Sequence, residues 1–186
     1  MSKYLDGVSD KYNNRLERLQ REPVIYVHID TTGIGKNDRV TRMSILADDT
    51  LAYYQVFNLG ADIGKMTRKA VELSGITRDD LQAAPVSFAD EKETIRTMLD
   101  GKLIICTGKD FMLEFLEREG LVLERDDVID LRAIVGMMNH TYSRTTMNDV
   151  LNTLYGPIVP EYETTQERNF LMYQCATRLK EIVEIA

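Results

Sequence analysis

The stretch that decides the fold is "VIYVHIDTTGIGKNDRV", Val24 to Val40. Its first residues are mostly β-branched or aromatic, which predicts a strand, and the Thr-Thr-Gly that follows predicts a turn. Side chains two positions apart on a strand point to the same side. We therefore expect Tyr26, His28 and Asp30 to share one face of a sheet, with the aliphatic residues between them on the other face.

The rest of the chain alternates between strand and helix patterns. Stretches 39–47 and 50–59 follow the turn and predict an antiparallel meander with the first strand. Beyond them, capped helical stretches alternate with two short apolar strands, and a long helix is expected from about Thr164 to Ile185. This order predicts an α/β fold of three layers, with three antiparallel strands, then β/α units, a mixed sheet and helices on both faces.

Size and composition set broad limits. The length of 186 residues fits one domain, and 44% hydrophobic residues are enough for a sizeable core. A formal net charge of −7 argues against a dedicated nucleic-acid binder, because such proteins carry a basic excess that neutralises phosphates. No apolar run is long enough to span a bilayer, and the first residues lack the apolar segment of a secretory signal. We expect a cytoplasmic protein without membrane contact, in which Cys106 and Cys175 are buried free thiols.

Residues 1–22 are a polar extension that ends at Pro23, and a domain is predicted over 23–186. Apolar residues in the extension recur at steps of three and four, which predicts an amphipathic helix with a stripe of Leu5, Val8, Tyr12, Leu16 and Leu19. Such a stripe either packs on its own domain or binds a protein partner or a second copy. Tyr12, Leu16 and Leu19 are the candidate partner-binding residues.

The tip of the first strand is the candidate site. Two carboxylates there would hold divalent metals that activate water, but one position is His28, and imidazole suits magnesium poorly. His28 and Asp30 form a hydrogen-bonded pair, bind one transition metal, or line a cleft without chemistry. The nearby Lys36, Arg39 and Arg42 can contact phosphates, although a solvated strand edge is the more usual reason for such a cluster.

Several motifs together resemble the DEDD, or epsilon-subunit-like, 3′–5′ exonucleases. "IDTTG" is similar to their first motif, Asp-x-Glu-Thr-Thr-Gly, and "SGITRDDLQAAPVSFAD", Ser74 to Asp90, is similar to their His-Gly-Ile-Thr…Leu…Ala-Pro-x-Phe connector. "IICTGKDFMLEFL" resembles their second motif, and "VIDLRAI" and "TTMNDVLNTLYG" resemble later elements. The resemblance covers roughly residues 23 to 186 and implies the ribonuclease H-like exonuclease fold.

The resemblance also implies a two-metal site held by four carboxylates, and most of these are missing. The first Asp position falls on His28, the Glu position on Asp30, and the second-motif Asp position on Met112, whose thioether is expected to fill a former metal cavity. Thr31, Thr32 and Gly33 are expected to serve the turn, because glycine permits a positive φ.

The third motif of the family opens the last helix as His-x-x-x-x-Asp. Its Asp position falls on Leu171 or Met172 and its His position on Gln166 or Glu167, with the register open by one residue. One acidic residue at four positions cannot assemble a two-metal site, so we assign no catalytic residue.

We therefore expect a catalytically inactive exonuclease-fold protein without a cofactor, acting as a binding or scaffold subunit in replication, repair, a mobile element or a phage. Its vestigial cleft is predicted to contain His28, Asp30, Thr31, Thr32 and Met112. Two alternatives stay open. One is a divergent active exonuclease on single-stranded DNA or RNA, which would use Mg²⁺ or Mn²⁺ with Asp30 and a ligand such as Asp149 or Glu167. The other is a module that holds a nucleic-acid end without cutting it.

Overall fold

The computed structural model describes residues 10–139, 145–156 and 165–184. Its centre is a five-stranded sheet of order β3-β2-β1-β4-β5. Three strands form an antiparallel meander: β1 (Val24–Thr31), β2 (Val40–Ala47) and β3 (Thr50–Val56). Two shorter strands extend it in parallel beside β1: β4 (Leu103–Cys106) and β5 (Val128–Asp130). The predicted mixed sheet is confirmed.

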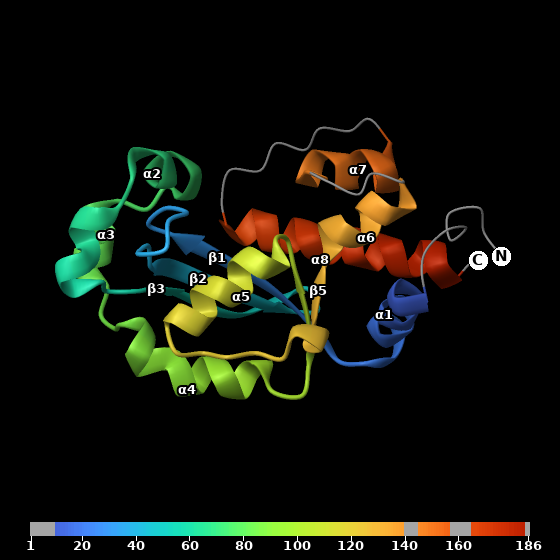
Figure 1. The fold of residues 1–186 in the computed structure, drawn as a ribbon, viewed down its shortest axis with the longest axis horizontal. Coiled ribbons are helices and arrows are strands. Elements are labelled where there is room, and N and C mark those ends of the chain that lie inside the picture. Colours follow the sequence, from blue (N-terminus) through green and yellow to red (C-terminus); the bar gives the residue numbers. More distant parts are fainter. Residues whose placement is uncertain (1–9, 140–144, 157–164, 185–186) are drawn as a thin grey trace.

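Helices cover both faces of this sheet. Figure 1 shows α4 (Phe88–Leu99) and α5 (Lys109–Arg118) lying together, with α6 to α8 as a separate group. The second group contains α6 (Leu131–Met138), α7 (Met147–Tyr155) and α8 (Thr165–Glu184), and α1 (Asp10–Arg21) packs with it. At one end of the molecule lie η1 (Gly60–Lys65), α2 (Arg68–Ser74) and α3 (Arg78–Ala83). The patterns did not predict η1 or the short 3₁₀ helix η2 (Arg125–Asp127).

The alternation of side chains along β1 divides the core in two. Ile25, Val27 and Ile29 pack with α4 and α5 on one face of the sheet. Tyr26 packs on the other face with α1, α6, α7 and α8. The predicted faces of β1 are therefore confirmed, and His28 and Asp30 lie on the side of α8.

Side-chain caps set the starts of several helices. In a capping box, a hydroxyl accepts from a backbone amide of the first turn while an acid accepts from the amide of the cap residue. Three helices begin in this way: α3 with Thr77 and Asp80, α4 with Ser87 and Asp90, and α7 with Thr146 and Asp149. α2 ends at Gly75, which adopts a left-handed φ of 68°. The predicted connector between β3 and α4 is thus confirmed in its local structure.

Helix α1 packs on the domain that follows it. Leu16 and Leu19 are 3% and 1% exposed and lie in the cluster beneath α8. Arg18 donates to the carboxylate of Asp127 at 2.9 Å and to the carbonyl of Asp126. The assignment of Leu16 and Leu19 to partner binding was wrong, because their side chains are already buried within the chain. The side chain of Tyr12, like all of residues 1–9, lies outside the described part.

Two further expectations concern the chain as a whole. Cys106 and Cys175 are free and buried, as predicted. Among the residues that the structure describes, no helix has both the length and the apolar character needed to cross a membrane.

Candidate functional site

The Thr-Thr-Gly turn after β1 is held by its own side chains. The Oγ1 of Thr31 donates to the carbonyl of Gly33 at 2.6 Å, and the Oγ1 of Thr32 donates to Oδ1 of Asp38 at 2.7 Å. The expectation of a positive φ at Gly33 was wrong. Glycine is needed there for space, because a Cβ would lie 2.6 Å from Oδ2 of Asp38.

Asp30, at the tip of β1, is paired with an arginine. It lies directly opposite Arg42 of β2 in the antiparallel ladder, and Nε and Nη2 of Arg42 are each 2.8 Å from its Oδ2. The Arg42 and Asp30 side chains are only 9% and 7% exposed. Arg42 also donates to the hydroxyl of Tyr54 at 3.1 Å and to the carbonyl of Ser74 at 2.9 Å. One guanidinium thus joins β1, β3 and the end of α2.

His28 lies beside this pair. Its Nε2 is 3.6 Å from Oδ1 of Asp30, which is too long for a hydrogen bond, and the two attract as charges only when the imidazole is protonated. Within the described residues the same Nε2 has no hydrogen-bond partner. The predicted alternative of a hydrogen-bonded His28–Asp30 pair is therefore wrong for this geometry.

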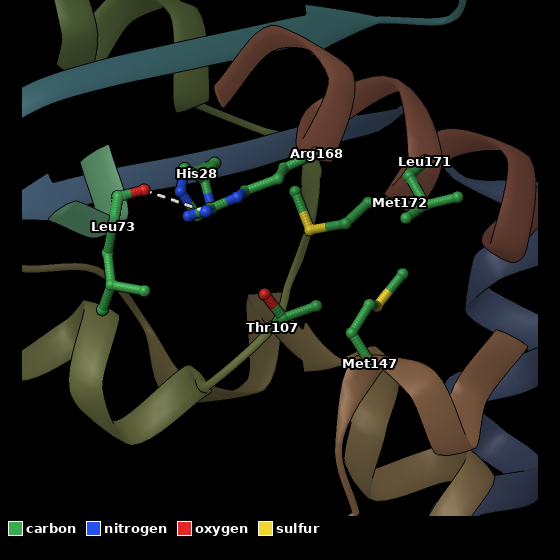
Figure 2. Close-up of a pocket in the computed structure, with 7 residues that line it drawn as sticks. All are labelled: His28, Leu73, Thr107, Met147, Arg168, Leu171 and Met172. Atoms are coloured by element: carbon green, nitrogen blue, oxygen red, sulfur yellow. Dashed lines mark hydrogen bonds between the residues drawn. The ribbon is translucent and has the colours of Figure 1, made fainter. Parts of the chain in front are cut away.

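The first-motif and third-motif positions meet in one cavity of about 260 Å³. His28 of β1 and Leu171 and Met172 of α8 line it, as Figure 2 shows. The other lining residues are Leu73, Thr107, Met147 and Arg168. Arg168 reaches from α8 and donates to the carbonyl of Leu73 at 2.9 Å. Both possible registers of the third motif therefore put an apolar side chain into the cavity.

A second cavity, of about 420 Å³, shares His28, Leu73 and Arg168 with the first. Asp30 and Thr31 line it from β1, and Phe111 lines it from α5. At its edge Ile34 is 89% exposed and Leu73 is 51% exposed. The two cavities together form the cleft of this protein.

Two predicted cleft residues are not part of either wall. Thr32 is fully buried in the turn, and Met112 is 2% exposed in the apolar cluster with Ile25 and Val27. The prediction that Thr32 and Met112 line the cleft was therefore wrong. On α5, Phe111 points to the cleft and Met112 to the core. The structure brings together His28, Asp30 and Thr31 of the predicted set.

No family model and no curated protein matches this chain. Solved structures do match. One shows a 3′-exonuclease in 3′-end specific recognition of a histone mRNA stem-loop, with a TM-score of 0.65 and 11% identity over 92% of this chain and 70% of that one. The Mg²⁺- and Mn²⁺-bound form of S. pombe Pop2p has a TM-score of 0.59 and 13% identity over 91% and 86% of the two chains. Exonuclease I has a TM-score of 0.63 and 16% identity over 85% of this chain and 40% of its own length.

This chain has the exonuclease fold. The three matches share the ribonuclease H-like arrangement of a mixed sheet between helices, and at such low identity they establish that arrangement alone. The predicted fold class is confirmed. Structural similarity at this level of identity does not show that this chain has the activity of the matched proteins.

The residues present do not fit the two-metal centre that the exonuclease fold implies. Divalent metals of this kind need several oxygen ligands, and Asp30 is the one acid at the four predicted carboxylate positions of the motifs. Among residues 10–139, 145–156 and 165–184, no group of three or more His, Cys, Asp or Glu side chains is placed to hold a metal. Asp149, the possible replacement ligand, accepts the cap hydrogen bonds of α7, and the side chain of Glu167 is not described.

The basic cluster near the turn has a different role from the one expected. Arg39 binds both carboxylate oxygens of Glu119, at 2.7 and 2.6 Å, and reaches Asp62 at 2.9 Å. The expectation of a solvated strand edge was therefore wrong for Arg39 and Arg42, and Lys36 is exposed as expected. Sequence reasoning missed the pairing of Arg42, although a lone charge inside the apolar run "VTRMSILA" is a signal for a buried partner.

Proposed function

We propose that this protein is a catalytically inactive member of the exonuclease fold that acts as a binding or scaffold subunit in nucleic-acid processing. The main support is the cavity in which the first-motif and third-motif positions lie together. His28, Leu171 and Met172 line it where the family has acids. Metal-assisted hydrolysis needs ligands that fix the metal and the attacking water. The described residues that line this cavity include no carboxylate for that task.

The binding role is supported by the second cavity. Its volume of about 420 Å³ lies within the range of sites that bury a ligand or a partner side chain. Ile34 and Leu73 line this cavity and are exposed, so a partner that fills it would cover apolar surface. We expect a partner to place an apolar group there. The setting in replication, repair, a mobile element or a phage, and the cytoplasmic location, belong to the same proposal.

A nuclease assay tests the inactivity. The whole chain is incubated with end-labelled single-stranded DNA and RNA in Mg²⁺, in Mn²⁺ and in EDTA, beside an active 3′-exonuclease as positive control. We expect no shortening of the labelled strands by this protein in any condition. Metal-dependent shortening that is lost in Asp30→Asn would contradict the proposal. Shortening that persists in that variant would identify a contaminating nuclease.

A second candidate, a module that holds a nucleic-acid end without cutting, is favoured by the cations of the cleft. Lys69 lines the second cavity with its side chain 73% exposed, and Arg168 lines both cavities. Fluorescence anisotropy with a labelled single strand measures this binding, which should weaken with salt by a slope of about −0.7 per contacted phosphate.

The matched variants for that measurement are two lysines. Lys69→Gln should weaken binding several-fold, whereas Lys180→Gln, about 18 Å further along α8 than Arg168, should not. Equal affinities of the two variants would place the strand outside the cleft, and no binding at all would leave the protein-binding role as the better proposal.

A further inference from the structure

We infer that Arg42 takes the place of a divalent metal in this exonuclease fold and makes its cleft independent of such metals. The family resemblance puts a metal-binding acid at the position of Asp30, and the structure puts a guanidinium against that acid. The inference goes beyond the proposed function, because it concerns how the cleft is kept folded and what it excludes.

Arg42 compensates the charge of Asp30. Asp30 is nearly completely buried, and a buried carboxylate is strongly unfavourable unless an opposite charge and hydrogen bonds satisfy it. Nε and Nη2 of Arg42 both lie 2.8 Å from its Oδ2. Nε2 of His28 lies 3.6 Å from Oδ1 and brings a charge only when it is protonated. Arg42 therefore places a permanent counter-charge against Asp30.

The geometry of a guanidinium suits the contacts that Arg42 makes. A metal would hold acids together, whereas a guanidinium carries five N–H donors in a planar fork and can join groups of different kinds. Arg42 uses them to bind Asp30 of β1, the hydroxyl of Tyr54 on β3 and the carbonyl of Ser74 at the end of α2. Its guanidinium also lies 5.7 Å from the centre of the Tyr54 ring. The same residue thus fixes the wall of the cleft that a metal would otherwise organise.

The positive charge of Arg42 also excludes a divalent cation from Asp30. A divalent cation bound to Asp30 would have to share Oδ2 with a positive guanidinium that is already within hydrogen-bond distance, and like charges this close repel strongly in a buried site. A second guanidinium, that of Arg168, lines both cavities, and Figure 2 shows it extending across the first cavity toward Leu73. Among the described residues that line the two cavities, Asp30 is the one acid, so no second carboxylate in these linings offsets the repulsion.

Thermal unfolding of four forms in EDTA, Mg²⁺ and Mn²⁺ tests the inference. The forms are the wild type, Arg42→Gln, the double variant Asp30→Asn with Arg42→Gln, and Arg68→Gln as a control at a 93% exposed position. The wild type and the control should have the same Tm in all three solutions. Arg42→Gln removes a permanent positive charge from the buried carboxylate of Asp30, so its Tm should fall by about 10 °C. The fall should be the same in EDTA, Mg²⁺ and Mn²⁺, because the described residues around Asp30 offer too few ligands to hold a metal.

The double variant separates charge compensation from packing. It has no buried charge left to compensate. We therefore expect it to recover most of the lost Tm and to have the same Tm in Mn²⁺ as in EDTA. Wild-type protein that gains Tm with Mn²⁺, or binds it saturably in calorimetry, would overturn the inference. So would an Arg42→Gln variant that is as stable as the wild type.

If Arg42→Gln does not fold, the double variant decides. A folded double variant supports the inference, and an unfolded one overturns it, because the loss would then come from packing alone. These outcomes do not depend on the nuclease assay, in which cleavage by the wild type would contradict the proposed function instead.

Discussion

At the scale of single residues, burial decides what each polar group can do. Asp30 keeps the charge that the family motif requires, yet its partner is Arg42, so the carboxylate is part of an internal ion pair. Ser44 and Asn169 form another buried contact, with Nδ2 of Asn169 donating to Oγ of Ser44 at 2.8 Å. Such pairs fix the register of β2 against its neighbours, because a buried polar group without a partner is costly.

Met112 gives a residue-scale prediction. Met112→Asp restores the second-motif acid in sequence, but it places a charge in the apolar cluster of α5. We expect a loss of more than about 3 kcal/mol in the free energy of unfolding, measured with urea. Met112→Leu should cost less than about 1.5 kcal/mol, because its volume and polarity are nearly conserved. Equal stability of the two variants would mean that the side chain can reach the cleft.

At the scale of elements, the apolar stripe of α1 was compatible with two interpretations, packing on its own domain or binding a partner. The apolar stripe fits a partner as well as it fits the domain, and its packing against α8 is a property of the folded chain. The hydrogen bond to Glu22 raises the pKa of Arg18 above its ordinary value, with that to Asp127 adding to it, so this residue stays charged while it joins α1 to η2. The helix is therefore part of the core rather than a free appendage.

Truncation of α1 side chains tests that conclusion. Leu19→Ala removes a side chain that is 1% exposed, and we expect it to cost about 2–5 kcal/mol in urea unfolding. Arg18→Ala should cost about 1 kcal/mol or less, because its ion pairs are partly exposed. Stability unchanged by Leu19→Ala would show that α1 detaches from the domain in solution and would restore its candidacy as a partner-binding helix.

At the scale of the whole molecule, burial predicts a loss of stability in alkali. Burial raises the pKa of Cys175 to about 12 and that of Tyr26 to about 12, and it also raises the pKa of Cys106. In the unfolded chain these groups ionise first, near pH 9 to 10. Their contribution is complete below that range and is lost as the pH rises toward 12, by at most about 1.4 kcal/mol per pH unit for each group.

Urea unfolding between neutral pH and pH 11 measures that loss. Tyr26→Phe keeps the ring and removes the titrating hydroxyl, so its stability should fall less steeply with pH than that of the wild type. Cys175→Ala should likewise flatten the alkaline limb, from a lower starting stability because of the cavity it leaves. Curves of the variants that run parallel to the wild type would contradict this assignment.

Much of the architecture was predictable because its signals are local. The alternation of β1, the caps at Thr77, Ser87 and Thr146, and the left-handed Gly75 each act within a few residues of chain. Of the site, the positions of His28 and Asp30 and the apolar third motif could be predicted by resemblance. The orientation of Met112 could not, because two neighbours on a helix differ in direction by about 100° and a small error of register exchanges Phe111 for Met112.

Amino-acid order was sufficient for the strands, the α-helices, several of their caps and the absence of acids at most motif positions, since each follows from neighbours along the chain. The pairing of Asp30 with Arg42, the burial of Leu16 and Leu19, and the meeting of His28 with Leu171 and Met172 were decided by the folded structure. These contacts join residues far apart in sequence through sheet register and helix packing, which local periodicity does not encode. The proposed replacement of a metal by the charge of Arg42 therefore depends on the tertiary structure.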